Sequence, residues 1–337
     1  MSIRPGRVAL LVALFAVAVG VAAWSGQSWT PASEPMADEP RQVIVFGMAP
    51  LGFRDLEQGD TPVLDRLLEE GAVGAMSTRT GSRVSTPEEG YLAIGAGSRV
   101  RVAAGAGVAY EAAEQLPNGG TGATLFQEAT GRPLEGGIGA AGAVASVRRN
   151  DGSAVRSHPG ALGQALREAG RSAAVVSNSD TVDAATGATI VDRPGVLALM
   201  DEGLAVDDGI VAGGRLLVED PTVPFGRKAD ADAVVSAVER MAATHDVVLV
   251  DPGELARAAA YERHVTEEQE GRVRAHALRR TDDILGRVLP LADEDTVLLV
   301  VSVAAGGDGL RLAPVVAVGG GLEPGYLVSP SVKRSGL

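Results

Sequence analysis

The chain has 337 residues, 45% of them hydrophobic, so it is long enough to bury one substantial core or two small ones. Its 43 acidic and 30 basic side chains give a formal net charge of −13, which argues against a nucleic-acid partner because phosphate binding needs a basic face. It contains no cysteine, which excludes disulfides, thiolate metal sites and a cysteine nucleophile.

An uncharged apolar run occupies residues 8–24, after Arg4 and Arg7 and before an acidic stretch. Positive charge before such a run and negative charge after it predict that the start stays inside the cell and the rest is exported. The run is slightly shorter than the roughly 20 residues that span a bilayer, and small residues at its end suit a signal peptidase. Residues 1–24 are therefore predicted to be a transmembrane anchor or a cleaved signal peptide. Residues 25–41, rich in Ser, Pro and acidic side chains, are predicted to be a linker.

Residues 42–337 alternate between helical patterns and short apolar strands. After a strand at residues 42–48, the sequence predicts a helix with Thr61 as its cap and Pro62 in its first position, ending at Gly71. The order of helix and apolar strand recurs at residues 160–178, 230–251 and 272–302. Fully apolar strands between helices predict an α/β fold, a three-layer α/β/α sandwich around a mostly parallel sheet.

The segment between residues 100 and 160 lacks this regular pattern. Gly and Ala dominate it, and only residues 121–130 predict a helix. We interpret the segment as an excursion from the sheet within a single domain.

A strand predicted at residues 73–78 is followed by Ser-Thr-Pro-Glu-Glu at residues 85–89, which predicts a helix N-terminus. There a hydroxyl satisfies a free amide, Pro fits the first turn and acidic side chains favour the helix dipole. The same position suits a hydroxyl that attacks phosphorus, because free amides and the dipole favour an incoming anion. Ser85, with Thr86 as the second choice, is therefore a candidate nucleophile or a helix cap.

The order of these segments resembles the alkaline phosphatase superfamily, especially its phosphodiesterase and sulfatase-like branches. Three stretches carry the resemblance: residues 60–76, residues 85–99 with Ser85 in the nucleophile's place, and residues 281–302. The resemblance implies hydrolysis of phosphate or sulfate esters with two divalent metal ions, typically zinc. The chain is also similar to bacterial membrane proteins that carry such a domain outside the membrane.

Most of the metal ligands that this resemblance implies are replaced by apolar residues. Expected Asp and His positions fall on Met48 or Ala49, Leu255, Val303 and Ala304. No pair of the four histidines has the spacing of a zinc site. Asp251 stands where one ligand would. We interpret it either as a turn residue or as a residual ligand that shares a magnesium or calcium ion with Ser85 and a further acid, Glu88 or Asp308.

Three hypotheses follow. In the leading one, the domain is degenerate and non-catalytic, needs no cofactor, and serves as a binding or structural module on the extracytoplasmic side of the cell membrane, or as a secreted one if the signal is cut. In the second, it is a phosphoester or sulfoester hydrolase that uses Ser85 and zinc, magnesium or calcium. In the third, the chain is a fragment whose missing C-terminal part supplies a ligand or a membrane domain.

Overall fold

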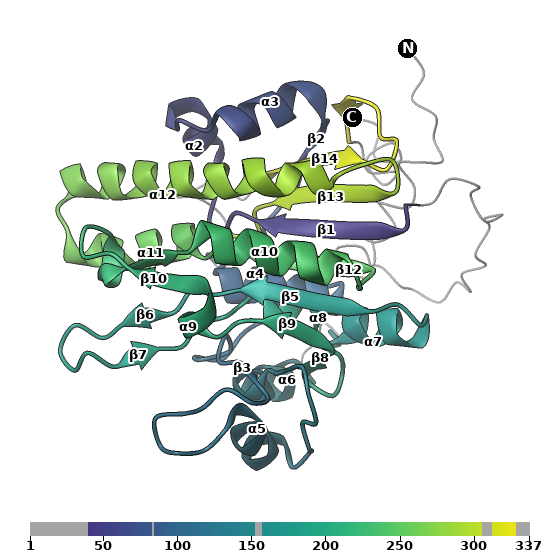
Figure 1. Cartoon of the computed structure of the whole chain (residues 1–337), viewed down its shortest axis with the longest axis vertical. Helices are drawn as coiled ribbons and strands as arrows, with labels where there is room; N and C mark the ends of the chain where they lie inside the picture. Colours follow the sequence, from purple (N-terminus) through teal and green to yellow (C-terminus); the bar gives the residue numbers. More distant parts are fainter. Residues whose placement is uncertain (1–39, 83, 152–156, 305–311, 328–337) are drawn as a thin grey trace.

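The computed structural model describes residues 40–82, 84–151, 157–304 and 312–327, so the predicted anchor or signal at residues 1–24 lies outside the described residues. At the centre is an eight-stranded sheet in the order β15-β2-β14-β13-β1-β12-β5-β9 (Figure 1). In that order the strands are Gly325–Tyr326, Ala72–Ser77, Leu312–Gly319, Thr296–Val301, Gln42–Gly47, Val247–Asp251, Ala173–Ser177 and Asp208–Ile210. Strands β13, β1, β12, β5 and β9 run parallel, and β14 is antiparallel to both of its neighbours.

Helices cover both faces of this sheet and produce three layers. One face carries α2 (Phe53–Gln58), α3 (Pro62–Glu70), α10 (Ala231–Ala242), α11 (Glu254–Tyr261) and α12 (Glu267–Val288). The other carries α4 (Pro87–Ala96), α7 (Ala161–Glu168) and α8 (Val196–Leu199). The predicted α/β/α sandwich with a mostly parallel sheet is confirmed.

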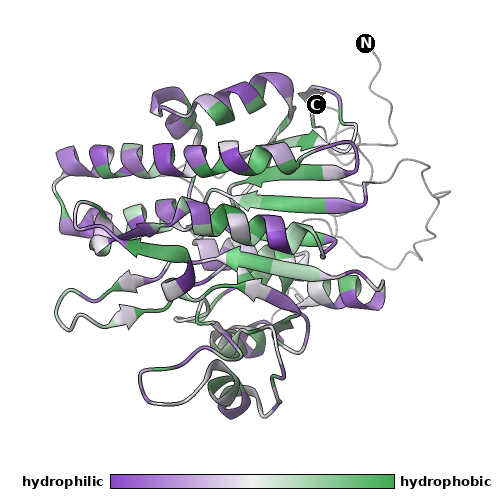
Figure 2. Cartoon of the chain, viewed as in Figure 1, coloured by the Kyte–Doolittle hydropathy of each residue, from purple (hydrophilic) through white to green (hydrophobic). Residues whose placement is uncertain are grey.

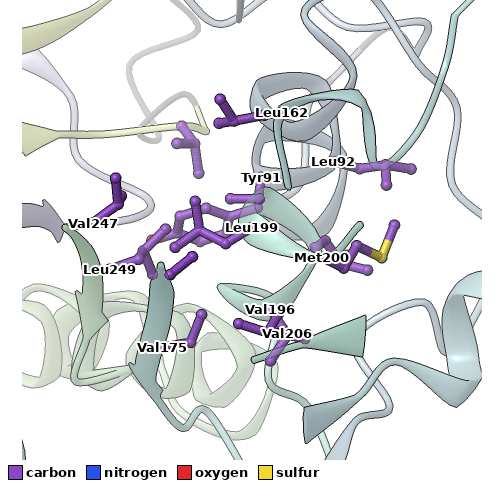
Figure 3. Packing of buried hydrophobic residues seen from close by; sticks show 14 of the residues in the cluster. Tyr91, Leu92, Leu162, Val175, Val196, Leu199, Met200, Val206, Val247 and Leu249 are labelled. Carbon is purple, nitrogen blue, oxygen red and sulfur yellow. The ribbon is translucent and has the colours of Figure 1, made fainter. Parts of the chain in front are cut away.

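Each central strand contributes to two separate apolar cores because its side chains alternate between the two faces. In β13, Val297, Leu299 and Val301 belong to the core under α4, α7 and α8, whereas Leu298 and Val300 face α10 and α12. Figure 2 shows the resulting pattern, with hydrophobic strands inside and hydrophilic outer helix surfaces. Figure 3 shows the first core, in which Tyr91 and other α4 and α8 side chains lie against β5 and β12.

The local signals in the sequence set the helix boundaries. Helix α3 has Thr61 as its N-cap, Pro62 in its first position and Gly71 at its C-cap, as predicted. The strand predicted at residues 73–78 is β2, one residue earlier at each end. The first amides and last carbonyls of a helix lack partners within the helix, so particular residue types are favoured at its ends. The sequence therefore indicates where such helices begin and end.

The excursion between residues 100 and 160 contains more regular structure than expected. Its predicted helix is α5 (Gly122–Thr130), but the segment also holds α6 (Val144–Asp151) and two short strands, β3 (Tyr110–Glu111) and β4 (Ile138–Gly139). Strand β4 pairs with β8 (Ala205–Val206), which ties the excursion to a later part of the chain. Strands of two residues carry no readable alternation, so the sequence did not indicate them.

The remaining elements are short. They comprise the hairpins β6 (Thr181–Val182) with β7 (Thr189–Ile190) and β10 (Leu217–Glu219) with β11 (Arg227–Ala229), helix α9 (Gly213–Leu216), and the 3₁₀ turns η1 (Ala141–Ala143), η2 (Pro224–Gly226), η3 (Glu262–His264) and η4 (Leu289–Leu291). Among the helices of the described ranges, none combines the length and the apolar character needed to cross a bilayer.

Candidate functional site

The candidate site lies where the parallel strands end. The carboxyl ends of parallel strands share one edge of a sheet, and in open α/β folds ligands bind at that edge. Here β12 ends in Asp251, β1 ends in Gly47, and the N-terminus of α4 brings Ser85 and Thr86. The strand ends and the start of α4 therefore bring the candidates from the sequence into one region.

The two hydroxyls ahead of α4 have different roles. Thr86 is the N-cap, and its hydroxyl accepts a hydrogen bond from the Glu89 amide at 3.3 Å. Ser85 is partly exposed, and within the described residues its hydroxyl makes no hydrogen bond. No base of the described chain is thus in hydrogen-bond contact with Ser85, whereas an activated nucleophile needs such a partner or a metal.

Asp251 is buried, with 3% of its surface exposed, and both of its carboxylate oxygens are engaged. Oδ2 accepts a hydrogen bond from the Tyr91 hydroxyl at 2.6 Å, and Oδ1 accepts one from the Gly253 amide at 2.8 Å. The hydrogen bond from the Gly253 amide forms the turn that was one of the two interpretations of Asp251 from the sequence. Burial raises the pKa of Asp251 to about 6, against the opposing effect of the two hydrogen bonds.

A glycine makes the contact between Tyr91 and Asp251 possible. A Cβ atom at Gly47 would lie 1.9 Å from the Tyr91 hydroxyl oxygen and 3.2 Å from the Asp251 Cβ. Any larger residue at the end of β1 would displace the phenol. Burial and the neighbouring carboxylate also raise the pKa of Tyr91 well above its usual value, so the phenol stays a hydrogen-bond donor.

The positions that the resemblance assigned to further metal ligands are apolar and buried. Met48, Ala49, Leu255, Val303 and Ala304 are each exposed by 2% or less and line the two cores. Asp308, the other suggested oxygen ligand, lies outside the described residues. Within the described ranges, no group of three His, Asp or Glu side chains is arranged to hold a metal ion. The donor set present at the strand ends therefore does not fit the two-zinc site that the resemblance implies.

Two further carboxylates after β5 and β7, Asp180 and Asp192, were not singled out by the sequence alone. Burial, followed by the charges of Glu88, Asp180 and Asp251, raises the pKa of Asp192 to about 8. The Asp192 amide donates to Asp180 Oδ1 at 2.9 Å and its carbonyl accepts from the Ser179 amide at 2.9 Å, so Asp192 lies against the segment that follows β5. Asp180 belongs to the Ser-Asn-Ser-Asp run that begins with the last residue of β5. A polar run at the end of an apolar strand was the signal in the sequence that could have identified it.

Arg193 compensates part of this buried negative charge. Its guanidinium donates to both oxygens of Asp180, at 3.2 and 2.9 Å, and to both oxygens of Glu114, at 2.6 and 2.7 Å. It also donates to the carbonyl of Ala109 at 2.8 Å. Such bidentate pairs are the strong form of the interaction. They join the excursion that contains Glu114 to the strand end that contains Asp180.

Comparisons with known proteins give structural neighbours only, since no protein-family model and no curated protein matches the chain. A protein from Pyrococcus horikoshii is 15% identical with a TM-score of 0.47, over 84% of this chain and 87% of that one. The alkaline phosphatase from the Antarctic bacterium TAB5 is 13% identical with a TM-score of 0.44, over 86% and 95%. The lipoteichoic acid synthase LtaP from Listeria monocytogenes is 13% identical with a TM-score of 0.43, over 88% and 72%. Likeness at this level carries no information on activity.

Proposed function

We propose that the chain is an alkaline phosphatase-like domain that binds a ligand or partner in the cell envelope and does not hydrolyse esters. The observation that carries the proposal is the state of Asp251. Its two oxygens are occupied by Tyr91 and Gly253, so the one acidic residue left at an expected ligand position serves to join α4 to β12.

The chemistry of ester hydrolysis supports the same proposal. Attack on a phosphate or sulfate ester builds negative charge that needs a cation or preorganised donors to oppose it. Apart from Asp251, the expected ligand positions carry no metal-binding atoms except the thioether of Met48. These positions therefore offer no ready site for a cation that would oppose the charge of the transition state.

The alternative function is a hydrolase with Ser85 as nucleophile and an oxygen-only metal set. The observation in its favour is that the charges of Glu88 and Asp251 both raise the pKa of Asp192, so the three carboxylates interact although they are not arranged as a metal site. A magnesium or calcium ion bound by oxygen ligands would neutralise them. This function requires Asp251 to exchange its present hydrogen bonds for the ion.

The location is also a proposal. The apolar run at residues 8–24 would hold the domain at the extracytoplasmic face of the membrane, or direct its secretion if it is cleaved. The net charge of −13 supports the absence of a nucleic-acid partner. Membrane fractionation of cells that express the full chain, followed by protease treatment of intact cells without their outer permeability barrier, tests the location. The domain should be digested by the added protease. A domain that the protease cannot reach would contradict the proposed location.

A hydrolysis assay separates the two functions. The full-length protein, supplied with zinc, magnesium or calcium in turn, is incubated with a generic aryl phosphate diester beside its Ser85→Ala variant. We expect both proteins to release product at the same background rate. Metal-dependent release that disappears in Ser85→Ala would establish the hydrolase instead.

A further inference from the structure

A pocket lies beside α4, on a different side of this helix from the contact between Tyr91 and Asp251. It has a volume of about 160 Å³ and is lined by the end of β2, the loop after it, one face of α4 and the residues that follow α4. The α4 residues that line it, Gly90, Ala93 and Ile94, have the spacing of one helix face. The volume is well above the roughly 30 Å³ that a water molecule occupies in the liquid, so the pocket has room for a small polar group.

Two buried hydroxyls in the wall of this pocket have no partner. Thr78 and Ser98 are exposed by 4% and 7%, and within the described chain neither hydroxyl makes a hydrogen bond. A buried polar group without a partner costs about 1–3 kcal/mol. Native structures therefore rarely keep such groups unless water, an ion or a ligand completes them.

Two arginines line the same pocket. Arg79 and Arg99 are exposed, and among the described residues neither guanidinium forms an ion pair with a carboxylate. The buried acid Glu89 does not pair with them: its two oxygens accept hydrogen bonds from the hydroxyls of Thr80, which also lines the pocket, and of Ser82, and these contacts hold the loop after β2 in place. The pocket therefore presents two free positive charges on a chain whose net charge is −13.

We propose that this pocket binds a phosphate or sulfate group. Arg79 and Arg99 supply the charge and the planar donors that match a tetrahedral oxyanion, and the hydroxyls of Thr78 and Ser98 donate the hydrogen bonds that they lack. The apolar wall formed by Ala93, Ile94 and Val303 strengthens these interactions by keeping the local dielectric low. The overall negative charge of the chain opposes non-specific anion binding, so binding requires this local arrangement.

The inference rests on the proposed function in one respect, because a binding module holds its ligand without cleaving it. The pocket lies apart from Ser85, whose hydroxyl would attack an ester in the alternative function. A ligand held by Arg79 and Arg99 is therefore expected to remain intact.

Calorimetric titration of inorganic phosphate and of sulfate into the full-length protein tests the pocket. We expect saturable binding with one site per chain, weakened about tenfold by Arg79→Gln and by Arg99→Gln because each removes a charge-assisted contact. Arg272→Gln is the matched control: it changes an exposed arginine of α12 that has no ion-pair partner in the described part of the chain, and it should leave the affinity unchanged. No saturable binding, or equal weakening by the control, would overturn the proposal.

Ser98→Ala provides a test that a purely structural role would not pass. Without ligand, loss of an unpaired buried hydroxyl should leave the urea midpoint unchanged or raise it. The same substitution should weaken phosphate binding severalfold. A lower midpoint with unchanged affinity would mean that the hydroxyl serves the fold and would contradict its assignment to the pocket.

Two further arms identify the source of the phosphate group and keep the two proposals distinguishable. Glycerol 3-phosphate represents a free phosphate ester, and dioctanoyl phosphatidic acid represents a lipid headgroup. The compound that binds with the higher affinity indicates the source of the phosphate group. An aryl phosphate incubated with the protein should bind and remain intact. Hydrolysis abolished by Ser85→Ala would refute the non-catalytic function alone, whereas absence of both binding and hydrolysis would refute the pocket alone.

Discussion

Replacement of Asp251 by asparagine should stabilise the protein at neutral pH. The carboxylate is buried among α4 and the strand ends, and its pKa is raised to about 6 from an ordinary 3.8 because burial disfavours the charged form. Asparagine retains an acceptor oxygen for the Gly253 amide and presents its amide group to the Tyr91 hydroxyl, which accepts as well as donates. The substitution therefore removes the charge and keeps the contacts.

The size and sign of the effect follow from proton linkage. An acid whose pKa is higher in the folded chain than in the unfolded chain binds more protons when folded, so stability falls as the pH rises through that window. For Asp251 the window runs from about pH 4 to about pH 6. The pKa of Asp251 in the folded chain is about two units above its ordinary value, and each unit corresponds to about 1.4 kcal/mol. The free energy of unfolding of Asp251→Asn should therefore exceed that of the wild type by at most about 3 kcal/mol above pH 7.

Urea unfolding at a series of pH values between 4.5 and 8 measures this effect. We expect the free energy of unfolding of Asp251→Asn to exceed that of the wild type by about 1–3 kcal/mol at pH 7, with the difference vanishing toward pH 4. Asp283→Asn, at an exposed position of α12, is the control and should change little. A variant that is less stable than the wild type at pH 7, or a difference that does not depend on pH, would refute the reasoning.

Four further substitutions test the contacts around the site by their urea midpoints. Gly47→Ala places a Cβ atom 1.9 Å from the Tyr91 hydroxyl oxygen and should lower the free energy of unfolding by about 1–3 kcal/mol. An unchanged urea midpoint would show that the Tyr91 side chain does not occupy this position. Thr86→Ala should cost about 1 kcal/mol through loss of the cap, while Ser85→Ala should stay within about 0.5 kcal/mol, and the reverse order would exchange their roles. Arg193→Met should cost about 3–5 kcal/mol because it leaves buried carboxylates unpaired, and a loss below about 1 kcal/mol would contradict that pairing.

The layered fold was predictable because its signals are local. Thr61, Pro62 and Gly71 define one helix by their own backbone chemistry, and fully apolar strands predict a sheet covered on both faces. The short strands β3, β4 and β8 were not predictable, since pairs of two residues form only when distant parts of the chain meet. Long-range pairing of this kind leaves no periodic pattern in the sequence.

The candidate site was predictable in part. The strand-end position of Asp251 and the helix start at Thr86 follow from the sequence, but the hydrogen bond between Tyr91 and Asp251 joins residues 160 positions apart. That contact depends on the space left by Gly47, which has no signature of its own. Similarly, Arg193 is one of 28 arginines, and only the fold shows that it is buried between two acids.

The metal content of the full-length protein tests the central claim most directly. The protein is loaded with zinc, magnesium and calcium in turn, dialysed, and analysed by inductively coupled plasma mass spectrometry beside Asp251→Asn. Because the expected ligand positions are apolar and both oxygens of Asp251 are occupied, the account predicts no stoichiometric metal in either protein. One or two equivalents of a divalent metal that survive dialysis in the wild type and disappear in Asp251→Asn would contradict it.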